Sequence, residues 1–233
     1  MHPSLLTVYK SPFPKIRIGK DNDGGYVIVD VPNPAYSILL AGGIDNDLSF
    51  EEQFVAKYPN LNCLAFDGSE GLVPAHNEKI TFMHKYISGY VNEHVTNLHD
   101  LIDENSSVFI KMDIEGHEIP WIKSLNTTQL NKLDQIVLEF HHPFTDNEPE
   151  AFEKLNQNHF LVHFHANNCC GIRNHNGVNI PNVFECTYLH KKYFTRFPEL
   201  NSDVIPGVLD MKNVDRDEIY INHPPFVNLE RSF

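Results

Sequence analysis

Short apolar runs alternate with segments of helical periodicity along this chain, and this alternation limits the possible folds more than any other feature. Four of these runs read as buried strands, namely Tyr36–Ala41, Asn62–Phe66, Val108–Met112 and Gln135–Phe140. Strands that alternate with helices form βαβ units, which require parallel pairing and right-handed crossovers. We therefore predict an α/β fold with a Rossmann-like, mostly parallel twisted sheet and helices on both faces.

The edges of the sheet are predicted from shorter patterns. Further strands are expected at Tyr26–Val29, Ile80–Tyr86, Phe160–His165 and Val183–Tyr188. Histidines at positions 163 and 165 share one face of their strand, because side chains alternate with a period of two.

Helices are predicted between the strands. Ser49 and Glu52 have the spacing of a capping box, which favours a helix start at this point. Apolar faces at helical spacing indicate three more helices, on Val95, Leu98, Leu101 and Ile102; on Trp121, Ile122 and Leu125; and on Phe152 and Leu155 after Asn147 and Pro149.

A single domain is expected from the 233 residues, since no internal repeat or low-complexity linker divides them. We predict an N-terminal extension with a short strand at 1–35, a core at 36–194 and a tail at 195–233. The tail contains several prolines and has weak periodicity, so it should be rich in loops.

Charge and hydropathy restrict the possible partners. The formal net charge of −13 argues against a nucleic-acid partner, because such a surface repels phosphate backbones. No apolar run reaches the roughly 18 residues of a membrane span. Met1–Lys10 shows no basic start followed by a long apolar stretch, so no signal peptide is expected. We expect a small-molecule or glycan substrate and no membrane partner, and the oligomeric state is left open.

The four cysteines, Cys63, Cys169, Cys170 and Cys186, show no paired spacing of the metal-binding type. Adjacent cysteines rarely bridge each other. A reduced, cytoplasmic setting is therefore the simplest interpretation.

The first predicted ligand site follows two strand ends, because ligands of such sheets bind beyond the carboxyl ends of the strands. Gly42 and Gly43 would let the backbone approach a ligand, but they do not form the GxGxxG pattern of a pyrophosphate site. Asp67 ends the next strand and could accept hydrogen bonds from ribose hydroxyls. These features suit S-adenosylmethionine, although the glycines could simply form a turn and Asp67 could simply cap one.

The second predicted site follows the next two strands. Asp113 and Glu139 should point into one crevice if their strands are neighbours. They are the leading candidates for a general base or for ligands of a divalent cation such as Mg or Mn, with His141 and His165 next. The tentative metal ligands are Asp113, Glu139 and His165, and His165 could instead be the base.

Other charged residues nearby have simpler interpretations. Glu115 and Glu118 precede a short helix, where acidic residues favour the helix dipole. Lys111 could neutralise neighbouring acids, and His142 and His163 could be structural histidines.

These motifs resemble a known family. KMDIEGHE (Lys111–Glu118) is similar to the signature of the FkbM-like S-adenosylmethionine-dependent methyltransferases, and IVLEFHH (Ile136–His142) also resembles that family. RIGKDNDGGYVI (Arg17–Ile28) and HFHANN (His163–Asn168) resemble a subgroup seen in bacterial and large-virus glycan gene sets. The resemblance extends from Arg17 to about Phe194.

The resemblance implies a class I methyltransferase fold and O-methylation of a sugar hydroxyl or of a non-sugar natural product, with the subgroup favouring the sugar. It assigns Gly42, Gly43, Asp45 and Asp67 to the cofactor, and Asp113 and Glu139 to the reaction. The first turn departs from the commoner Asp/Glu-x-Gly-x-Gly form. A viral source would place the protein in the host cytoplasm.

Two other classes of function remain open at this stage. The same fold could support a metal-dependent hydrolase or a nicotinamide oxidoreductase, although the missing GxGxxG speaks against the latter. A non-catalytic carbohydrate-binding domain is the other alternative. The acidic residues at both strand ends argue against the loss of catalysis.

Overall fold

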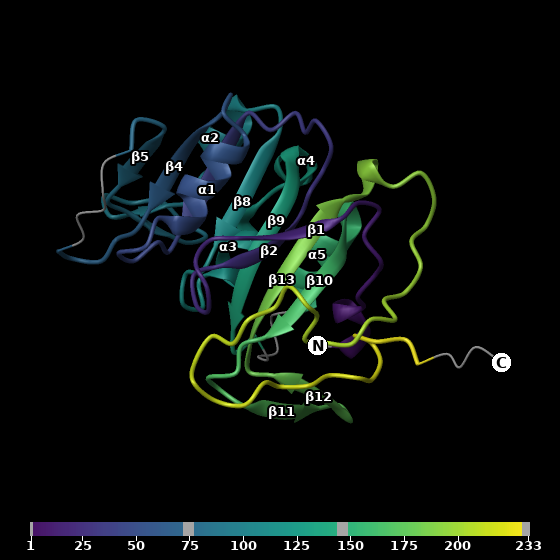
Figure 1. Cartoon of the computed structure of the whole chain (residues 1–233). Helices are drawn as coiled ribbons and strands as arrows, with labels where there is room; N and C mark the ends of the chain where they lie inside the picture. The colour runs from purple at the N-terminus through teal and green to yellow at the C-terminus, as the bar shows by residue number, and fades with distance from the viewer. Residues whose placement is uncertain (1, 72–76, 144–148, 230–233) are drawn as a thin grey trace.

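The computed structural model describes residues 2–71, 77–143 and 149–229. Its centre is a seven-stranded sheet in the order β10-β13-β9-β8-β3-β4-β5 (Figure 1). The strands of this sheet are β3 (Ile38–Gly42), β4 (Asn62–Phe66), β5 (Ile80–Met83), β8 (Val108–Met112), β9 (Leu133–His141), β10 (His159–Ala166) and β13 (Val183–His190). All seven lie at or near predicted strands.

The direction of the strands confirms the predicted Rossmann-like fold. β9, β8, β3, β4 and β5 pair in parallel, whereas β13 is antiparallel to both β9 and β10. The chain order reverses at β3, which pairs with β4 on one side and with β8 on the other. This is the topological switch point, where ligands of such sheets bind.

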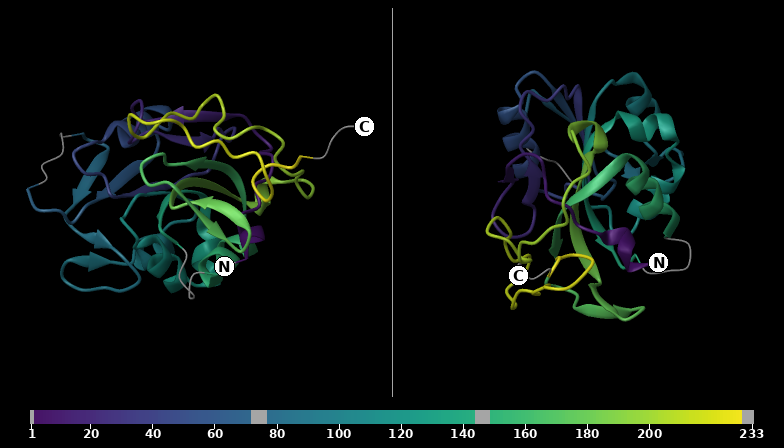
Figure 2. Two further views of the ribbon diagram at one scale, coloured as in Figure 1. Left: turned by 90° about the horizontal axis from the view of Figure 1, so that it is seen from below. Right: turned by 90° about the vertical axis from the view of Figure 1, so that its right-hand side faces the viewer.

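The two faces of the sheet are covered differently. One face packs against the four helices α2 (His99–Glu104), α3 (Glu118–Ser124), α4 (Thr127–Lys132) and α5 (Pro149–Asn158). The other face packs against α1 (Ser49–Lys57) and a hairpin of β1 (Lys15–Ile18) and β2 (Tyr26–Val29). Figure 2 shows the C-terminal tail on the same side as this hairpin, away from the four helices.

The hairpin is anchored to the sheet by polar side chains. Gln135 of β9 exchanges two hydrogen bonds with the backbone of Val29, with N–O distances of 2.6 and 3.1 Å. Thr187 of β13 donates to the carbonyl of Val27. These contacts hold Tyr26, at the start of β2, over the carboxyl ends of the central strands. The sequence predicted β2 but not β1.

Several local predictions were wrong. Ser49 does not cap α1: Leu48 is the N-cap residue, and the Ser49 hydroxyl accepts the N–H of Lys20 at 2.9 Å. The predicted strand Ile80–Tyr86 is divided, since β5 ends at Met83 and a two-residue strand β6 (Tyr86–Ile87) pairs with β7 (Val95–Thr96). Val95 therefore belongs to a strand and not to the predicted helix.

Other elements were not predicted. A capping box does occur in the chain, but at α4, where Asn126 and Gln129 cap each other's backbone. The unpredicted hairpin is formed by β11 (Ile172–His175) and β12 (Val178–Pro181), and the short 3-10 helices are η1 (Pro3–Leu6) and η2 (Lys191–Tyr193). Helix α5 carries buried Phe152 and Leu155 as predicted, whereas Asn147 lies outside the described residues.

The cysteines also differ from expectation. Cys169 and Cys170 form a disulfide in the turn between β10 and β11. Asn167 accepts the N–H of Cys169 at 2.9 Å, and Gly171 adopts a left-handed backbone conformation with φ +73°. The disulfide therefore lies in a turn whose backbone is fixed by these features. Cys63 and Cys186 are free and buried.

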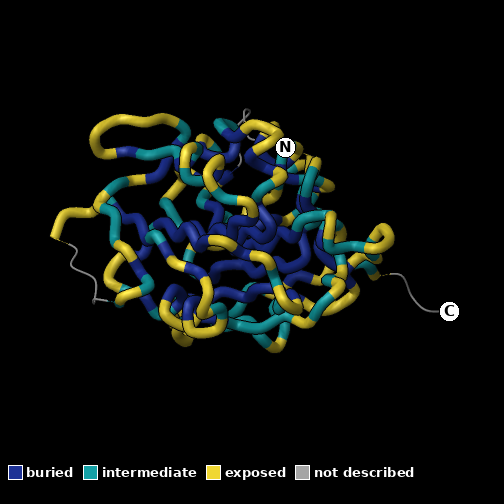
Figure 3. Tube along the Cα trace, turned by 90° about the horizontal axis from the view of Figure 1, so that it is seen from above, coloured by how far each residue is buried: buried dark blue, intermediate teal, exposed yellow. Residues whose placement is uncertain are grey.

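Burial is concentrated in the strands of the central sheet, which form the dark interior of Figure 3. Past Tyr193, the described tail contains isolated bridges but no helix or strand. None of the helices in the described ranges is long and apolar enough to cross a membrane.

Candidate active site

A cavity of about 540 Å³ opens at the carboxyl ends of β3, β4 and β8, and we call it the switch-point cavity. Its lining includes Gly43, Asp45, Asp67, Ser69, Tyr86 and Asp113. Three of the four residues predicted to bind the cofactor therefore border one space. The fourth, Gly42, does not line it. A Cβ atom on Gly42 would lie 2.5 Å from Cδ1 of Ile87, so this glycine packs closely against that side chain.

Asp67 fixes the shape of the switch-point cavity through backbone hydrogen bonds. Its carboxylate accepts the N–H of Asp45 at 3.0 Å and the N–H of Ser69 at 2.8 Å. Asp45 has a left-handed backbone with φ +44°. Asp67 therefore connects the loops after β3 and β4 and also presents its carboxylate to the cavity.

Gly43 brings the loop after β3 into close contact with the backbone of Asp113, after β8. It has φ +68°, and a Cβ atom there would lie 1.5 Å from the carbonyl oxygen of Asp113. Its own carbonyl accepts a hydrogen bond from Nζ of Lys111 at 2.9 Å. Only glycine fits this position, because any side chain would displace the loop after β8.

A second cavity of about 480 Å³, the acid cavity, lies beside the first. It is lined by Asp23, Asp113, Glu115, Glu139, His141 and Asn167, among others. Asp23, Asp113 and Glu115 line both cavities. The predicted convergence of Asp113 and Glu139 is thus observed in a single cavity, at its boundary with the other.

Strand register explains how these acidic residues meet. Met112 of β8 is paired with Leu138 of β9, so Asp113 and Glu139 follow at the same level. Glu139 is paired with Glu185 of β13. Paired residues of neighbouring strands project from the same face of a sheet, so the three carboxylates form a row.

Glu139 is buried and Asp113 is partly exposed, and hydrogen bonds fix both carboxylates. Tyr26 donates its hydroxyl to Asp113 at 2.9 Å, and Asn167 donates its amide to Glu139 at 2.6 Å. Burial raises the pKa of both carboxyls, and the charges of Asp113 and Glu185 raise the pKa of Glu139 further. These surroundings favour the protonated form of the pair more than water does.

His141 supplies the opposite charge. Its Nδ1 lies 3.1 Å from Glu118, and its Nε2 lies 3.5 Å from Glu115 and 3.7 Å from Asp113. Burial alone would lower the pKa of His141, but the hydrogen bond and charge of Glu118, together with the charge of Asp113, raise it to about 9. At neutral pH this imidazole is a cation, which suits charge compensation better than the predicted role as base.

Glu118 has a structural role that the helix-dipole interpretation missed. One of its buried carboxylate oxygens accepts the N–H groups of Ile114 and Gly116, at 3.1 and 3.3 Å, and also contacts His141. It therefore shapes the loop that carries Glu115. The signal was present in the KMDIEGHE motif, whose last residue is this glutamate.

His165 lies apart from both cavities. It is buried, with Nδ1 3.3 Å from Glu185 and Nε2 3.6 Å from Glu218. Burial would lower the pKa of His165, but the charge and hydrogen bond of Glu185 raise it to about 9. Strand β13 lies between β9 and β10, so His165 meets Glu185 and not Glu139.

The geometry also changes the candidate cation ligands. Among the described residues, the group whose ligand atoms lie within 4.8 Å of one another is Asp113, Glu115 and His141. Of the predicted ligands Asp113, Glu139 and His165, only Asp113 belongs to it. Mixed carboxylate and imidazole donors fit a divalent cation such as Mn²⁺, but the imidazole would first have to lose its proton.

Comparison with solved structures found distant similarities. The chain is 12% identical to a precorrin-6y C5,15-methyltransferase from Geobacter metallireducens GS-15, with 68% of this chain and 84% of that chain covered and a TM-score of 0.38. It is 10% identical to a Thermoplasma acidophilum protein described as a "putative methyltransferase", with 76% and 83% covered and a TM-score of 0.35. Among curated proteins, no sequence matches the chain.

A family match agrees with the geometry at the sheet edge. The methyltransferase FkbM domain matches residues 9–168, which include β1, β2 and every central strand except β13. This range contains both cavities' shared residues and the complete KMDIEGHE motif. Membership implies S-adenosylmethionine as the methyl donor. The chain belongs to the FkbM methyltransferase domain family.

Proposed function

We propose that the protein transfers a methyl group from S-adenosylmethionine to a hydroxyl group of a sugar or glycan. The observation that carries this proposal is that Asp113 lines both the switch-point cavity and the acid cavity. A methyl donor and a hydroxyl acceptor must meet in line, without water between them. Two adjoining cavities that share a carboxylate provide such a meeting place.

The switch-point cavity fits the cofactor in size and chemistry. Its volume of about 540 Å³ lies within the range of small-molecule sites. Asp67 offers acceptors for ribose hydroxyls, and the Asp113 and Glu115 carboxylates favour a cation at the border with the acid cavity. S-adenosylmethionine, when bound, supplies a methyl group on a positively charged sulfur.

The acid cavity contains groups that can accept the proton of the acceptor hydroxyl. Transfer forms an O–C bond and breaks the C–S bond, so the acceptor hydroxyl must release a proton. The carboxyl pair of Asp113 and Glu139 is placed to receive it, because its raised affinity for protons suits a general base. Tyr26 and Asn167 orient the two groups, and the cationic His141 limits the charge repulsion between them.

The lining of the acid cavity supports a polyhydroxylated acceptor. Asn167, Asn213 and His142 border it together with the carboxylates, and such groups donate to or accept from several hydroxyls at once. The resemblance to a subgroup seen in bacterial and large-virus glycan gene sets points the same way. A non-sugar natural product is the alternative acceptor.

A divalent cation is a separate part of the proposal. Asp113, Glu115 and His141 would hold it, and it would lower the pKa of the acceptor hydroxyl. If it is required, a chelator should abolish turnover and added Mg²⁺ or Mn²⁺ should restore it. Full turnover in chelator would leave the carboxyl pair as the base.

The experiment is a transfer assay with methyl-labelled S-adenosylmethionine and two acceptor panels, one of mono- and oligosaccharides and one of hydroxylated natural products. We expect label on a saccharide oxygen, located by mass spectrometry after glycosidic cleavage. Label only on the second panel would contradict the sugar acceptor. A protein that binds both cofactor and saccharide but transfers no label would be a binding domain.

A further inference from the structure

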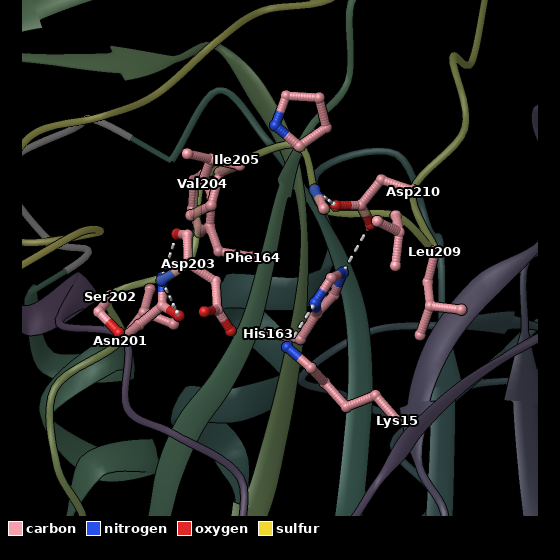
Figure 4. Close-up of a pocket in the computed structure, with 14 residues that line it drawn as sticks. Lys15, His163, Phe164, Asn201, Ser202, Asp203, Val204, Ile205, Leu209 and Asp210 are labelled. Atoms are coloured by element: carbon pink, nitrogen blue, oxygen red, sulfur yellow. Dashed lines mark hydrogen bonds and ion pairs between the residues drawn. The ribbon is translucent and has the colours of Figure 1, made fainter.

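A third cavity of about 640 Å³, the tail cavity, lies between the C-terminal tail and β10 (Figure 4). Tail residues 201–210 form most of its wall, and Lys15 of β1 and His163 of β10 complete it. It shares no lining residue with the switch-point cavity or the acid cavity. The proposed methyl transfer therefore gives it no role.

Polar groups in the tail cavity are connected by successive polar contacts. The side chain of Asp210 is buried and accepts a hydrogen bond from Nε2 of His163 at 2.8 Å. The other oxygen of Asp210 accepts the N–H of Gly207 at 2.7 Å, which ties the tail to this histidine. The other ring nitrogen of His163, Nδ1, lies 3.4 Å from Nζ of Lys15.

Lys15 and Asp203 bring opposite charges to this cavity without forming an ion pair. The Lys15 ammonium has two long contacts, each of 3.4 Å, with His163 and with the carbonyl of Val162. In the described part of the chain, the Asp203 carboxylate has no hydrogen bond or ion pair. Their charges still interact: burial lowers the pKa of Lys15, and the charges of Asp210 and, more weakly, Asp203 oppose this change.

The rim of the tail cavity is apolar and exposed. Val204 is 66% exposed and Val208 is fully exposed, and Leu209 lies beside them in the lining. Exposed apolar side chains around a polar floor are typical of a ligand site. Figure 4 shows Val204, Leu209 and the polar groups around one space.

We propose that the tail cavity is a saccharide-binding site separate from the methyl-transfer site. Hydroxyl groups both donate and accept hydrogen bonds, so one sugar can satisfy the Lys15 ammonium and the Asp203 carboxylate together. An anionic ligand would be repelled by Asp203, and a cationic one by Lys15. The C–H face of a sugar ring would cover the apolar rim at Val204 and Val208, and the cavity volume suits a disaccharide better than a single amino acid.

The test is isothermal titration of the whole protein with maltose, cellobiose and lactose, in the absence of S-adenosylmethionine. Lys15→Met keeps the aliphatic stem and removes the charge, and Asp203→Asn removes the carboxylate charge. Lys10→Met is the matched control, because Lys10 is exposed, pairs with Glu199 and does not line the cavity. Circular dichroism checks that every variant is folded.

We expect at least one disaccharide to bind, with affinity lowered about tenfold or more in Lys15→Met and in Asp203→Asn and unchanged in Lys10→Met. Binding should persist in Asp113→Asn, which separates this site from the acceptor site. Three results would overturn the proposal: no binding of any disaccharide, binding that both variants retain, or binding that Asp113→Asn removes. Lys15-dependent binding of acetate in place of the sugars would identify an anion site and would also overturn it.

Discussion

The switch-point cavity and the acid cavity adjoin each other, but their acidic residues are held in opposite ways. Asp67 is fixed by backbone N–H groups of two loops, whereas Asp113 and Glu139 are fixed by the side chains of Tyr26 and Asn167. Buried neighbouring carboxylates favour a retained proton. The difference shows that acidic residues at one edge of a sheet can be held either by the backbone of loops or by neighbouring side chains.

Gly43→Ala should produce the largest effect, because it disturbs the close contact between Gly43, which lines the switch-point cavity, and Asp113, which lines both cavities. The new Cβ would collide with the carbonyl of Asp113, at a backbone conformation that disfavours alanine. We expect a loss of about 3 kcal/mol or more in the free energy of unfolding, together with loss of cofactor binding and of turnover. Denaturant unfolding and titration with S-adenosylhomocysteine measure these effects.

The control for this variant is Gly71→Ala. Gly71 also has a positive φ, of +82°, but no atom lies within 4 Å of the point that its Cβ would occupy. It should lose only about 1 kcal/mol. Equal losses in the two variants would show that backbone conformation, and not contact between the two regions, limits Gly43.

Asp113→Asn should lower the rate far more than it weakens cofactor binding, because the Glu115 carboxylate still lines the switch-point cavity. The amide keeps the shape of the side chain but cannot accept the proton. We expect kcat to fall about 10²- to 10³-fold, as for loss of a general base. Tyr26→Phe, which removes only the orienting hydrogen bond, should cause a smaller fall. If Asp113→Asn weakens cofactor binding as much as it lowers kcat, the division between the two cavities is wrong.

Asp67→Asn should have the opposite pattern. One oxygen remains to accept the N–H of either Asp45 or Ser69, but the charge, the other of these hydrogen bonds and one acceptor for the ribose are lost. We expect the dissociation constant of S-adenosylmethionine to rise about tenfold, with kcat at saturation unchanged. Asp100→Asn, on the exposed side of α2, serves as the control. A fall in kcat with unchanged binding would assign Asp67 to the reaction.

The pH dependence of stability tests the buried charge of His165, which lies apart from both cavities. The pKa of His165 is raised to about 9 in the folded protein, so its stabilising contribution is complete below about pH 6.5 and is lost as the pH rises through 9. Between pH 6.5 and 9.5, the wild type should lose roughly 1–2 kcal/mol more than His165→Gln. His141 shifts in the same direction in both proteins and cancels in the comparison. Equal losses would mean that His165 is neutral when folded.

The residues at the ends of the central strands were predictable from sequence. Asp67, Asp113 and Glu139 each follow or end an apolar run, and parallel strands bring their carboxyl ends to one edge. The structure accordingly places Asp67 and Asp113 in one cavity, and Asp113 and Glu139 in another. Periodicity along the chain was sufficient here, because each prediction depended on one strand and its neighbour.

The partners of His165 and Glu118 were not predictable in this way. The position of His165 beside Glu185 depends on β13, which enters the sheet between β9 and β10 although it follows both in the sequence. Glu118 was interpreted as a residue favouring the helix dipole, yet its carboxylate reaches back to the loop and across to His141. Both contacts depend on the packing of separate segments.

The sequence by itself determined the α/β alternation, the family signature and the acidic residues at the strand ends, because these follow from local periodicity and residue chemistry. Only the tertiary structure decided which acidic residue meets which basic residue. It also decided where the hairpin of β1 and the tail lie, and that Cys169 and Cys170 are bonded. Such pairings depend on strand order and on burial. Strand order brings together ionisable side chains that are distant in the chain, and their charges and burial then shift each other's pKa. Charge placement in this protein is therefore a property of the assembled sheet.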